Sequence, residues 1–476
     1  MPPSRSRQHE ELFLSITNRD EKAWRRLAEK VFIERARLRR KDWKAHFVRL
    51  RRNAPFIGDA LSQLGSDEFR SELDPRRFLI WAWCVLLSMP DNLREGFTKL
   101  KEGDAGGRGL EAEVERLRSQ RLEFHGLETV PEQQLRWLAA LTRLIDEDLA
   151  SLDYWPADPS KWKSSEWKSK GYPCFIVPVQ RAYRLKDGKE AEHRATQYHA
   201  LVPTHVGELD VDLILHEDST GSGEPETWAY GAAIFDDVVL SPRNVGEDEF
   251  ILADAPGPKA VDAVKDQIAK ALNDGCEVLA WPELTVPPDR LATIRQVLGQ
   301  NPLSSAQRIP IVAAGSWHVK DGDTYLNRCE ILQARGRTLT HCDKRRRFEF
   351  DGRKEAIVPT SRVPVIVMDD RLVAISICLD FCDDRVPDLY ADLGVDLVIV
   401  PSMGEQVTTQ GHQRHAKALQ SRHGSVTFLV QQHPYLSAKS QKAGVRGYSF
   451  ASPPDSKTGS SASIQNERYR KLMARR

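Results

Sequence analysis

The stretch "RLVAISICLDFCDDRVPDLYADLGVDLVIVPS", residues 371–402, decides the fold class of this 476-residue chain. Two apolar runs, 371–379 and 395–402, are typical of strands buried on both faces of a sheet. Between them, "DDRVPDLYADLG" has the spacing of apolar residues expected of a helix. A strand, a helix and a second strand in succession predict an α/β domain in which helices flank a buried sheet.

The same alternation continues on both sides of this stretch, over residues 226–476. Strands are expected at "WAYGAAIF", "EVLAW", "IPIVAAGSW" and "VTFLVQQH", and a hairpin at "YLNRCEILQARGRTLTHCDK". Helices are expected at "GPKAVDAVKDQIAKALNDG", "PDRLATIRQVLGQ" and "GHQRHAKALQSRHG". In domains of this class, reactive side chains gather on the loops that follow the carboxyl ends of the strands.

The N-terminal part of the chain has a different pattern. Residues 1–150 are predicted to form an α-helical domain, because "PRRFLIWAWCVLLSM" and "PEQQLRWLAALTRLIDEDLASL" repeat apolar residues at helical spacing. Eight of the eleven tryptophans precede residue 170, which predicts a core built from large aromatic side chains. Residues 151–225 turn to β patterns such as "CFIVPVQRAY", so we expect a short β-rich connecting segment there.

The 69 basic and 68 acidic residues nearly cancel, so the overall charge favours neither nucleic acid nor an anionic membrane as a partner. Residues 25–52 are a local exception, because twelve Lys or Arg and three acids predict a basic helix there. That helix either binds an acidic partner or nucleic acid, or is a solvated surface. No apolar run approaches the roughly 20 residues that span a bilayer, and seven cysteines fit free thiols, so we expect a cytoplasmic protein without membrane contact.

Three reactive side chains lie where predicted strands end. Glu283 follows "EVLAW", Lys344 follows "TLTHC", and Cys378 follows "LVAISI" at the start of a predicted helix. The exposed N–H groups of a helix N-terminus favour a thiolate, so Cys378 is the candidate nucleophile. A nucleophilic cysteine needs a base for its proton and a cation or N–H donors for the oxyanion. Glu283 and Lys344 are of the residue types that supply these two functions.

Four segments in chain order resemble the nitrilase, or carbon–nitrogen hydrolase, superfamily: "LAWPELTVP", "YLNRCEILQARGRTLTHCDKRRRFEF", "LVAISICLDFCDDR" and "GVDLVIVPSMG". The resemblance implies a nitrilase-like αββα sandwich in 226–476 and a Glu-Lys-Cys triad. In that triad Glu283 would be the general base, and Cys378 would be the nucleophile that forms a thioester. Lys344 and the backbone N–H of Leu379 would stabilise the oxyanion.

The resemblance also implies a second glutamate that orients the lysine and the attacking water. Glu355 in "KEAIVP" matches this position, with Glu349 as its competitor. The implied activity is hydrolysis of a carbon–nitrogen bond in a small amide or nitrile, with an amidase favoured over a nitrilase, and it requires no metal or organic cofactor. Superfamily members usually pair face to face, so a homo-oligomer is expected. The helical N-terminal module would then regulate the enzyme or recruit a partner.

Some residues depart from the superfamily pattern. Leu379 stands where the superfamily often has Tyr or Glu, and Cys382 and Asp383 stand where it usually has Phe-Pro-Glu. These changes leave an alternative function open. The chain would then be a catalytically inactive nitrilase-fold protein that binds a ligand or organises an assembly, such as a bacterial defence or regulatory complex.

Four side chains can be considered as ligands of one zinc ion: His341, Cys342, Cys378 and Cys382. Their spacing lacks a Cys-x-x-Cys pair, so no metal site is predicted. Cys382 is expected to be a core residue rather than a resolving thiol. His412 and His415 lie three residues apart on a predicted helix, and we expect solvated or capping histidines rather than ligand contacts.

Overall fold

The computed structural model describes residues 20–63, 76–91, 93, 109–120, 122–125, 130–151, 168–169, 171–179, 196–216, 227–235, 239–255, 260–300, 308–350, 352–382, 386–433, 446–451, 463–464 and 468–475. The chain forms two compact units, Met1–Gly207 and Glu208–Arg476. Helices and sheets are both present, which confirms the expected mixed α/β character. Within the described residues, no helix has both the length and the apolar character needed to cross a membrane.

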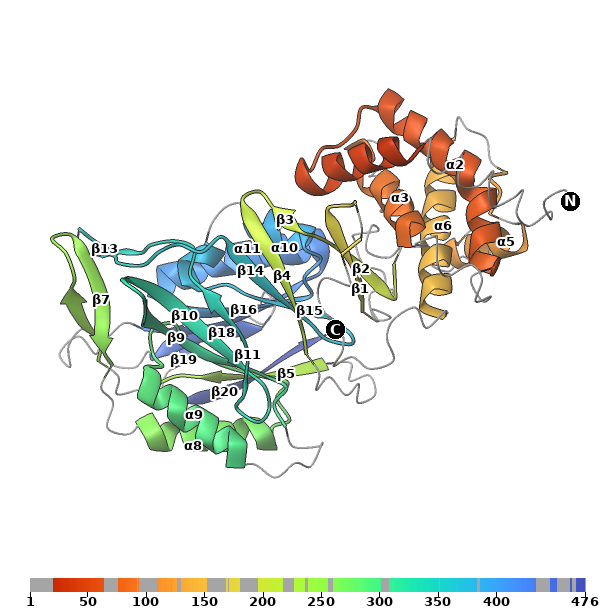
Figure 1. Cartoon of the computed structure of the whole chain (residues 1–476). Coiled ribbons are helices and arrows are strands. Elements are labelled where there is room, and N and C mark those ends of the chain that lie inside the picture. Colours follow the sequence, from red (N-terminus) through yellow and green to blue (C-terminus); the bar gives the residue numbers. More distant parts are fainter. Residues whose placement is uncertain are drawn as a thin grey trace, which may run out of the picture. The chain divides into compact units, whose positions relative to one another are not determined.

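The first unit includes the helices η1 (Glu29–Ile33), α2 (Arg40–Gln63), α3 (Arg76–Leu87), α5 (Leu110–Ser119) and α6 (Pro131–Ser151) (Figure 1). The unit also contains an antiparallel pair of strands, β1 (Cys174–Pro178) and β2 (His199–Pro203). The buried Asp146 of α6 holds this pair, because it accepts hydrogen bonds from the backbone of residues 197 and 198 and contacts His199 Nδ1 at 2.8 Å.

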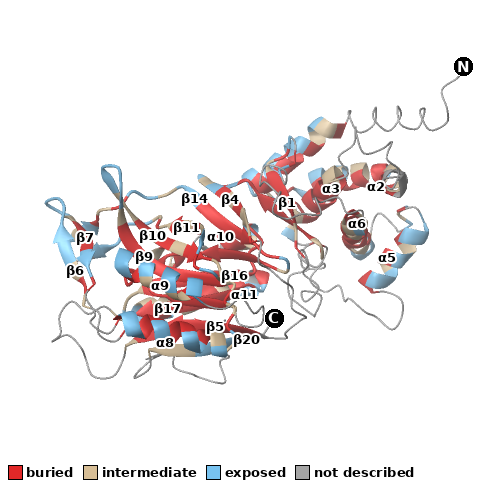
Figure 2. Cartoon of the chain, turned by 60° about the horizontal axis from the view of Figure 1, so that its bottom comes forward, coloured by how far each residue is buried: buried red, intermediate tan, exposed pale blue. Residues whose placement is uncertain are grey.

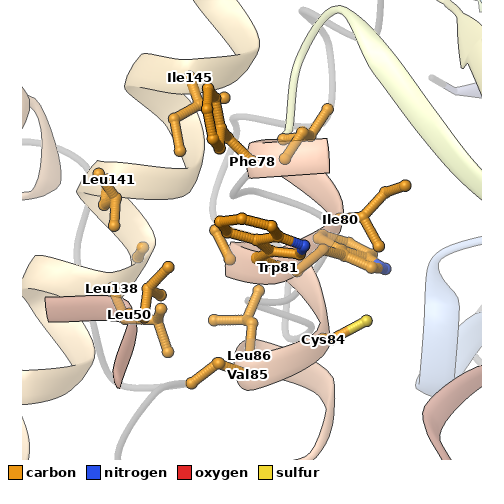
Figure 3. Packing of buried hydrophobic residues seen from close by; sticks show 14 of the residues in the cluster. Leu50, Phe78, Ile80, Trp81, Cys84, Val85, Leu86, Leu138, Leu141 and Ile145 are labelled. Atoms are coloured by element: carbon orange, nitrogen blue, oxygen red, sulfur yellow. The ribbon is translucent and has the colours of Figure 1, made fainter. Parts of the chain in front are cut away.

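Aromatic and aliphatic side chains fill the core of the first unit, as Figure 3 shows around Trp81. Trp81 stacks on Trp24 with 5.1 Å between ring centroids, and its indole N–H donates to Tyr172 Oη at 2.7 Å. The tryptophans of this part of the chain that the structure describes are all buried: Trp24, Trp43, Trp81, Trp83 and Trp137. The remaining three, at 155, 162 and 167, lie outside the described residues. The expectation of an aromatic core is confirmed for those that are described.

The basic segment 25–52 is not a single helix, so that expectation was wrong. The helical residues 20–28 continue into the π-helical turn η1, which ends at Ile33, and α2 begins only at Arg40. Arg35 between them has a left-handed backbone (φ 51°), which no α-helix accommodates. Leu38 then buries its side chain and donates its N–H to Ser88 O at 3.0 Å, so a tertiary contact fixes the break.

The expected connecting segment 151–225 does not form a unit of its own. Its strands β1 and β2 belong to the first compact unit, whereas β4 (Leu209–Leu215) belongs to the second. β4 pairs in parallel with β14 (Arg362–Val367), a strand that follows it by about 150 residues in the chain. A β-rich pattern read along the sequence does not reveal such a long-range partner.

The second unit contains two large sheets and one small sheet. One large sheet has the order β11 (Thr338–Asp343), β10 (Thr324–Leu332), β9 (Ile311–Asp321), β8 (Val278–Trp281), β5 (Thr227–Ala233) and β20 (Tyr469–Arg475). The other contains β19 (Ser463–Ile464), β18 (Gly447–Ala451), β17 (Val426–Gln432), β16 (Leu397–Met403), β15 (Leu372–Ile375), β14 and β4. The small sheet has the order β12 (Glu349–Phe350), β13 (Arg353–Glu355), β7 (Glu249–Asp254) and β6 (Ser241–Asn244).

Helices cover the two large sheets. The helices α8 (Ala260–Asn273) and α9 (Pro288–Gln300) contact each other and the sheet that contains β5 and β9. The helices α10 (Val386–Asp392) and α11 (Gln406–His423) contact each other, and α11 also contacts β17. Figures 1 and 2 show the two pairs in different places around the strands. Strands β16 and β17 also contact β8, so the two sheets pack against each other.

The central strands are buried and parallel, which brings their carboxyl ends to one edge. In one sheet β8 runs parallel to β5 and β9, and in the other β15, β16 and β17 run parallel to one another. All four residues of β8 and of β15 are buried, which explains their continuous apolar sequences. The residues that follow β8, β15 and β16 are therefore held near one another.

Candidate functional site

Glu283 lies in a tight turn directly after β8, and its side chain is buried. Leu284, the next residue, has a left-handed backbone (φ 57°) and donates its N–H to Ser316 Oγ at 3.2 Å. The turn packs closely on Gly315 of β9, where an added Cβ would lie 2.6 Å from Pro282 O. Glycine is therefore required at position 315, and the packed turn fixes the direction of the Glu283 carboxylate.

Lys344 lies between two carboxylates in the interior of the second unit. Its Nζ is 2.7 Å from Glu283 Oε1 and 2.8 Å from Glu355 Oε2, and all three side chains are at most 3% exposed. Burial lowers the pKa of Lys344, but the charges of Glu283 and Glu355 raise it by more, to well above its usual value. The ammonium group therefore stays protonated, and only two of its three N–H donors are used by these contacts.

Asn327 on β10 bridges the same two carboxylates. Its Nδ2 donates to Glu283 Oε1 at 3.0 Å and to Glu355 Oε1 at 2.8 Å. Its backbone carbonyl accepts the backbone N–H of Lys344 at 2.9 Å. The sequence prediction assigned no function to Asn327. A fully buried amide in the predicted hairpin strand "YLNRC" is the signal that could have identified it.

His318 on β9 was also missed, and it orients Glu355. Its Nδ1 accepts the backbone N–H of Leu252 at 2.8 Å, so the ring proton lies on Nε2, which contacts Glu355 Oε1 at 2.9 Å. Glu355 Oε2 also accepts the N–H of Phe348 at 3.0 Å. Burial raises the pKa of Glu355, but the charge of Lys344 and the His318 hydrogen bond lower it by more, to well below its usual range. The competitor residue Glu349 is exposed on β12.

Cys378 is the third residue after the end of β15 and is 6% exposed. Its backbone is left-handed (φ 44°), a conformation that costs a non-glycine residue about 1–3 kcal/mol. Ser402 Oγ lies 3.3 Å from Cys378 Sγ, and Met403 O lies 3.4 Å from the same sulfur. Met403 also donates its N–H to Glu283 Oε2 at 3.2 Å, so one backbone unit connects the thiol with the carboxylate.

The resting state of the Cys378 thiol differs from the expected one. Burial raises its pKa well above the usual value, and the negative charge of Glu283 raises it further, whereas Lys344 lowers it less. The expected helix N-terminus is only the four-residue 3-10 helix η6 (Cys378–Phe381), which has too few peptide dipoles to offset burial. The thiol is therefore protonated at rest and needs a base to become nucleophilic.

The other predicted residues have different surroundings. Leu379 is half-buried in η6, and the oxyanion role of its N–H stays a prediction. His412 and His415 are buried, so the expectation of solvated or capping histidines was wrong; α11 packs this face inward, and His412 contacts Ser402 and Cys382. Among the described residues, no group of three or more His, Cys, Asp or Glu side chains is arranged to hold a metal ion.

Sequence comparisons give no match to a protein-family model or to a curated protein. Solved structures do give matches. An amidase from Nesterenkonia sp. is 16% identical, with a TM-score of 0.37 over 54% of this chain and 94% of that chain. Saccharomyces cerevisiae Nit3, a member of branch 10 of the nitrilase superfamily, is 15% identical, with a TM-score of 0.35 over 52% and 90%. A glutamine-dependent NAD+ synthetase from Acinetobacter baumannii is 14% identical, with a TM-score of 0.37 over 52% and 46%. The chain is thus similar, over about half of its length, to solved structures that include nitrilase superfamily members.

Proposed function

We propose that the second unit is a nitrilase-like αββα domain that hydrolyses a carbon–nitrogen bond through a thioester on Cys378. An amidase is favoured over a nitrilase. The observation that carries this proposal is the buried cluster of Glu283, Lys344 and Glu355 next to a buried, strained cysteine. Burying one cation between two carboxylates costs desolvation free energy that ordinary packing would avoid, so such a cluster favours a chemical role.

The hydrogen bonds assign different roles to the two glutamates. Both oxygens of Glu355 accept two described hydrogen bonds each, so this carboxylate is fixed and remains ionised. Glu283 Oε1 also accepts two, but Oε2 accepts only one that the structure describes, from Met403 N–H. An oxygen with acceptor capacity left can take a proton. Glu283 is therefore the better base, and Glu355 is better suited to hold Lys344 in place.

The proposed reaction follows from these roles. Glu283 takes the Cys378 proton as sulfur attacks the amide carbon, and the new oxyanion receives hydrogen bonds from the third N–H of Lys344 and from Leu379 N–H. Glu283 then gives the proton to the leaving amine, and a thioester remains on Cys378. Glu283 next takes a proton from water, which attacks the thioester and releases the acid. The proton returns to sulfur, so the enzyme is regenerated without a cofactor.

Replacing Glu283 by Gln should lower the hydrolysis rate of an amide substrate by about 10²- to 10⁴-fold, the usual contribution of a general base. Gln has nearly the same shape, so the thermal unfolding midpoint should change much less than the rate. The measurement is kcat/KM on a panel of small amides and nitriles, with Glu349→Gln on the exposed strand β12 as the matched control. Equal hydrolysis rates in Glu283→Gln and wild type would show that Glu283 is not the general base. A wild-type protein that binds panel members without turnover would favour the catalytically inactive alternative.

A further inference from the structure

Three polar side chains behind Cys378 have no role in the reaction proposed above. Ser402 at the end of β16 contacts Cys378 Sγ at 3.3 Å and His412 Nε2 at 3.0 Å. The other ring nitrogen, His412 Nδ1, lies 3.3 Å from the sulfur of Cys382. Cys382, His412 and Ser402 thus form a continuous series of contacts that ends on the candidate nucleophile.

The surroundings fix the orientation of Ser402. Gln431 on β17 donates both hydrogens of its Nε2, to Glu405 O and to Thr409 Oγ1, each at 2.9 Å. Gln431 Oε1 therefore faces Ser402 Oγ, at 3.3 Å, and can only accept a hydrogen bond from it. The single hydroxyl proton of Ser402 has three acceptors within reach, which are Cys378 Sγ, Gln431 Oε1 and His412 Nε2.

The tautomer of His412 decides which of these acceptors is available. Burial, with a smaller contribution from His415, lowers the pKa of His412 to about 3, so the ring is neutral and carries one N–H. If the proton is on Nε2, the ring donates to Ser402 Oγ and leaves the hydroxyl proton for Cys378 or Gln431. If the proton is on Nδ1, the ring competes for the hydroxyl proton instead. When Cys382 donates its thiol proton in a hydrogen bond to Nδ1, that nitrogen acts as an acceptor and carries no proton. The ring proton is then on Nε2, which is the first arrangement.

We infer that Cys382, His412 and Ser402 form a positioning chain that presents the Ser402 hydroxyl to the Cys378 thiolate. The inference rests on the proposed function, because it concerns the same nucleophile. A hydrogen bond to an anion is stronger than one to a neutral amide oxygen, so the hydroxyl turns from Gln431 to Cys378 when the thiolate forms. The hydrogen bond from Ser402 therefore stabilises the thiolate form of Cys378 and not the neutral thiol. Other charged or titratable groups that act on these atoms are Glu283, Lys344, Arg346, Arg414 and His415.

The experiment measures the rate at which iodoacetamide alkylates Cys378 at about pH 7, by peptide mass spectrometry. Ser402→Ala should lower the rate by about 10- to 100-fold, the range for a lost hydrogen bond to a charged group. Ser402→Thr keeps the hydroxyl and should retain most of the wild-type rate. Cys382→Ala should lower the rate by several fold, whereas Cys382→Ser, which still donates to Nδ1, should restore it. Thermal unfolding of each variant identifies loss of folding, which would expose the buried thiol and raise its alkylation rate, the opposite of the effect expected for Ser402→Ala.

A Ser402→Ala protein with wild-type thermal stability and a wild-type alkylation rate would overturn the inference. An alkylation rate that is lowered equally in Cys382→Ser and Cys382→Ala would also contradict the inference. A side chain at position 382 that donates to His412 Nδ1 would then have no effect on Cys378. The proposed function fails differently. If wild type hydrolyses no panel amide or nitrile while the four alkylation rates follow the pattern above, the proposed function is excluded and the positioning chain stands. If wild type hydrolyses a panel member and Ser402→Ala alkylates at the wild-type rate, only the positioning chain is excluded.

Discussion

Replacing Cys378 by alanine is expected to lower hydrolysis by roughly 10⁴-fold or more, because no other group can then form the thioester. The side chain is nearly fully buried, and the change removes only one sulfur atom from it. Alanine also keeps a Cβ in the same left-handed backbone, so the strain of the turn is unchanged. The loss should therefore appear in kcat while the thermal unfolding midpoint stays close to that of wild type.

The measurement is single-turnover and steady-state hydrolysis on the same amide and nitrile panel. Cys276→Ala is a matched control, because Cys276 is also buried, whereas its described side-chain contact is with Tyr469 Oη on β20. Turnover that persists in Cys378→Ala would show that another group carries the chemistry, and the thioester mechanism would be abandoned.

Replacing Lys344 by methionine is expected to destabilise the fold by about 3–5 kcal/mol at neutral pH. Methionine fills a similar volume but leaves the carboxylates of Glu283 and Glu355 buried without their cation. Two negative charges at this spacing repel each other, and Asn327 can offset only part of the repulsion. Activity should be lost as well, because the oxyanion loses its cation.

The stability of this variant should depend on pH with a predictable sign. In wild type the pKa of Glu355 lies below its usual value of about 4.5, so its contribution is present above about pH 4.5 and is lost as the pH falls further. In Lys344→Met the lowering charge is gone and burial remains, so the pKa of Glu355 should be raised. A raised carboxyl pKa makes the folded state more stable at lower pH. The stability difference between wild type and variant should therefore shrink as the pH falls from about 7 to about 5.

The measurement is chemical denaturation of wild type and Lys344→Met at these pH values. Lys270→Met serves as the control, since Lys270 forms an exposed ion pair with Asp266 and should cost less than about 1 kcal/mol. A destabilisation of Lys344→Met no larger than that of the control would mean that Glu283 and Glu355 do not depend on the buried cation.

The sequence predicted the α/β alternation of the second unit because long apolar runs and helical spacing are local properties. It predicted that Glu283, Lys344 and Cys378 lie at strand ends for the same reason, since each comes within three residues of the end of a recognisable strand. Glu355 was assigned only from the resemblance of "KEAIVP" to the superfamily pattern, and its role stays a prediction. The structure adds that Glu283, Lys344 and Glu355 are in direct contact.

The sequence could not reveal partners that come from distant segments. His318 interacts with Leu252 through strand β7, and no local pattern indicated β7 or the small sheet to which it belongs. His412 was misjudged because a histidine on a polar helix usually faces solvent, whereas tertiary packing of α11 buries it. The electrostatic state of Cys378 was misjudged for a related reason. Burial depends on the whole fold, and here it outweighs the short helix that follows the cysteine.

Alkylation of Cys378 as a function of pH, compared between wild type and Glu283→Gln, tests the base and the nucleophile together without knowledge of the substrate. The negative charge of Glu283 raises the pKa of the buried Cys378 thiol, so its removal should lower that pKa. We predict that the alkylation rate of both proteins rises with pH, and that the profile of Glu283→Gln lies at lower pH by about one unit or more. Identical profiles in the two proteins would contradict the pairing of Glu283 with Cys378.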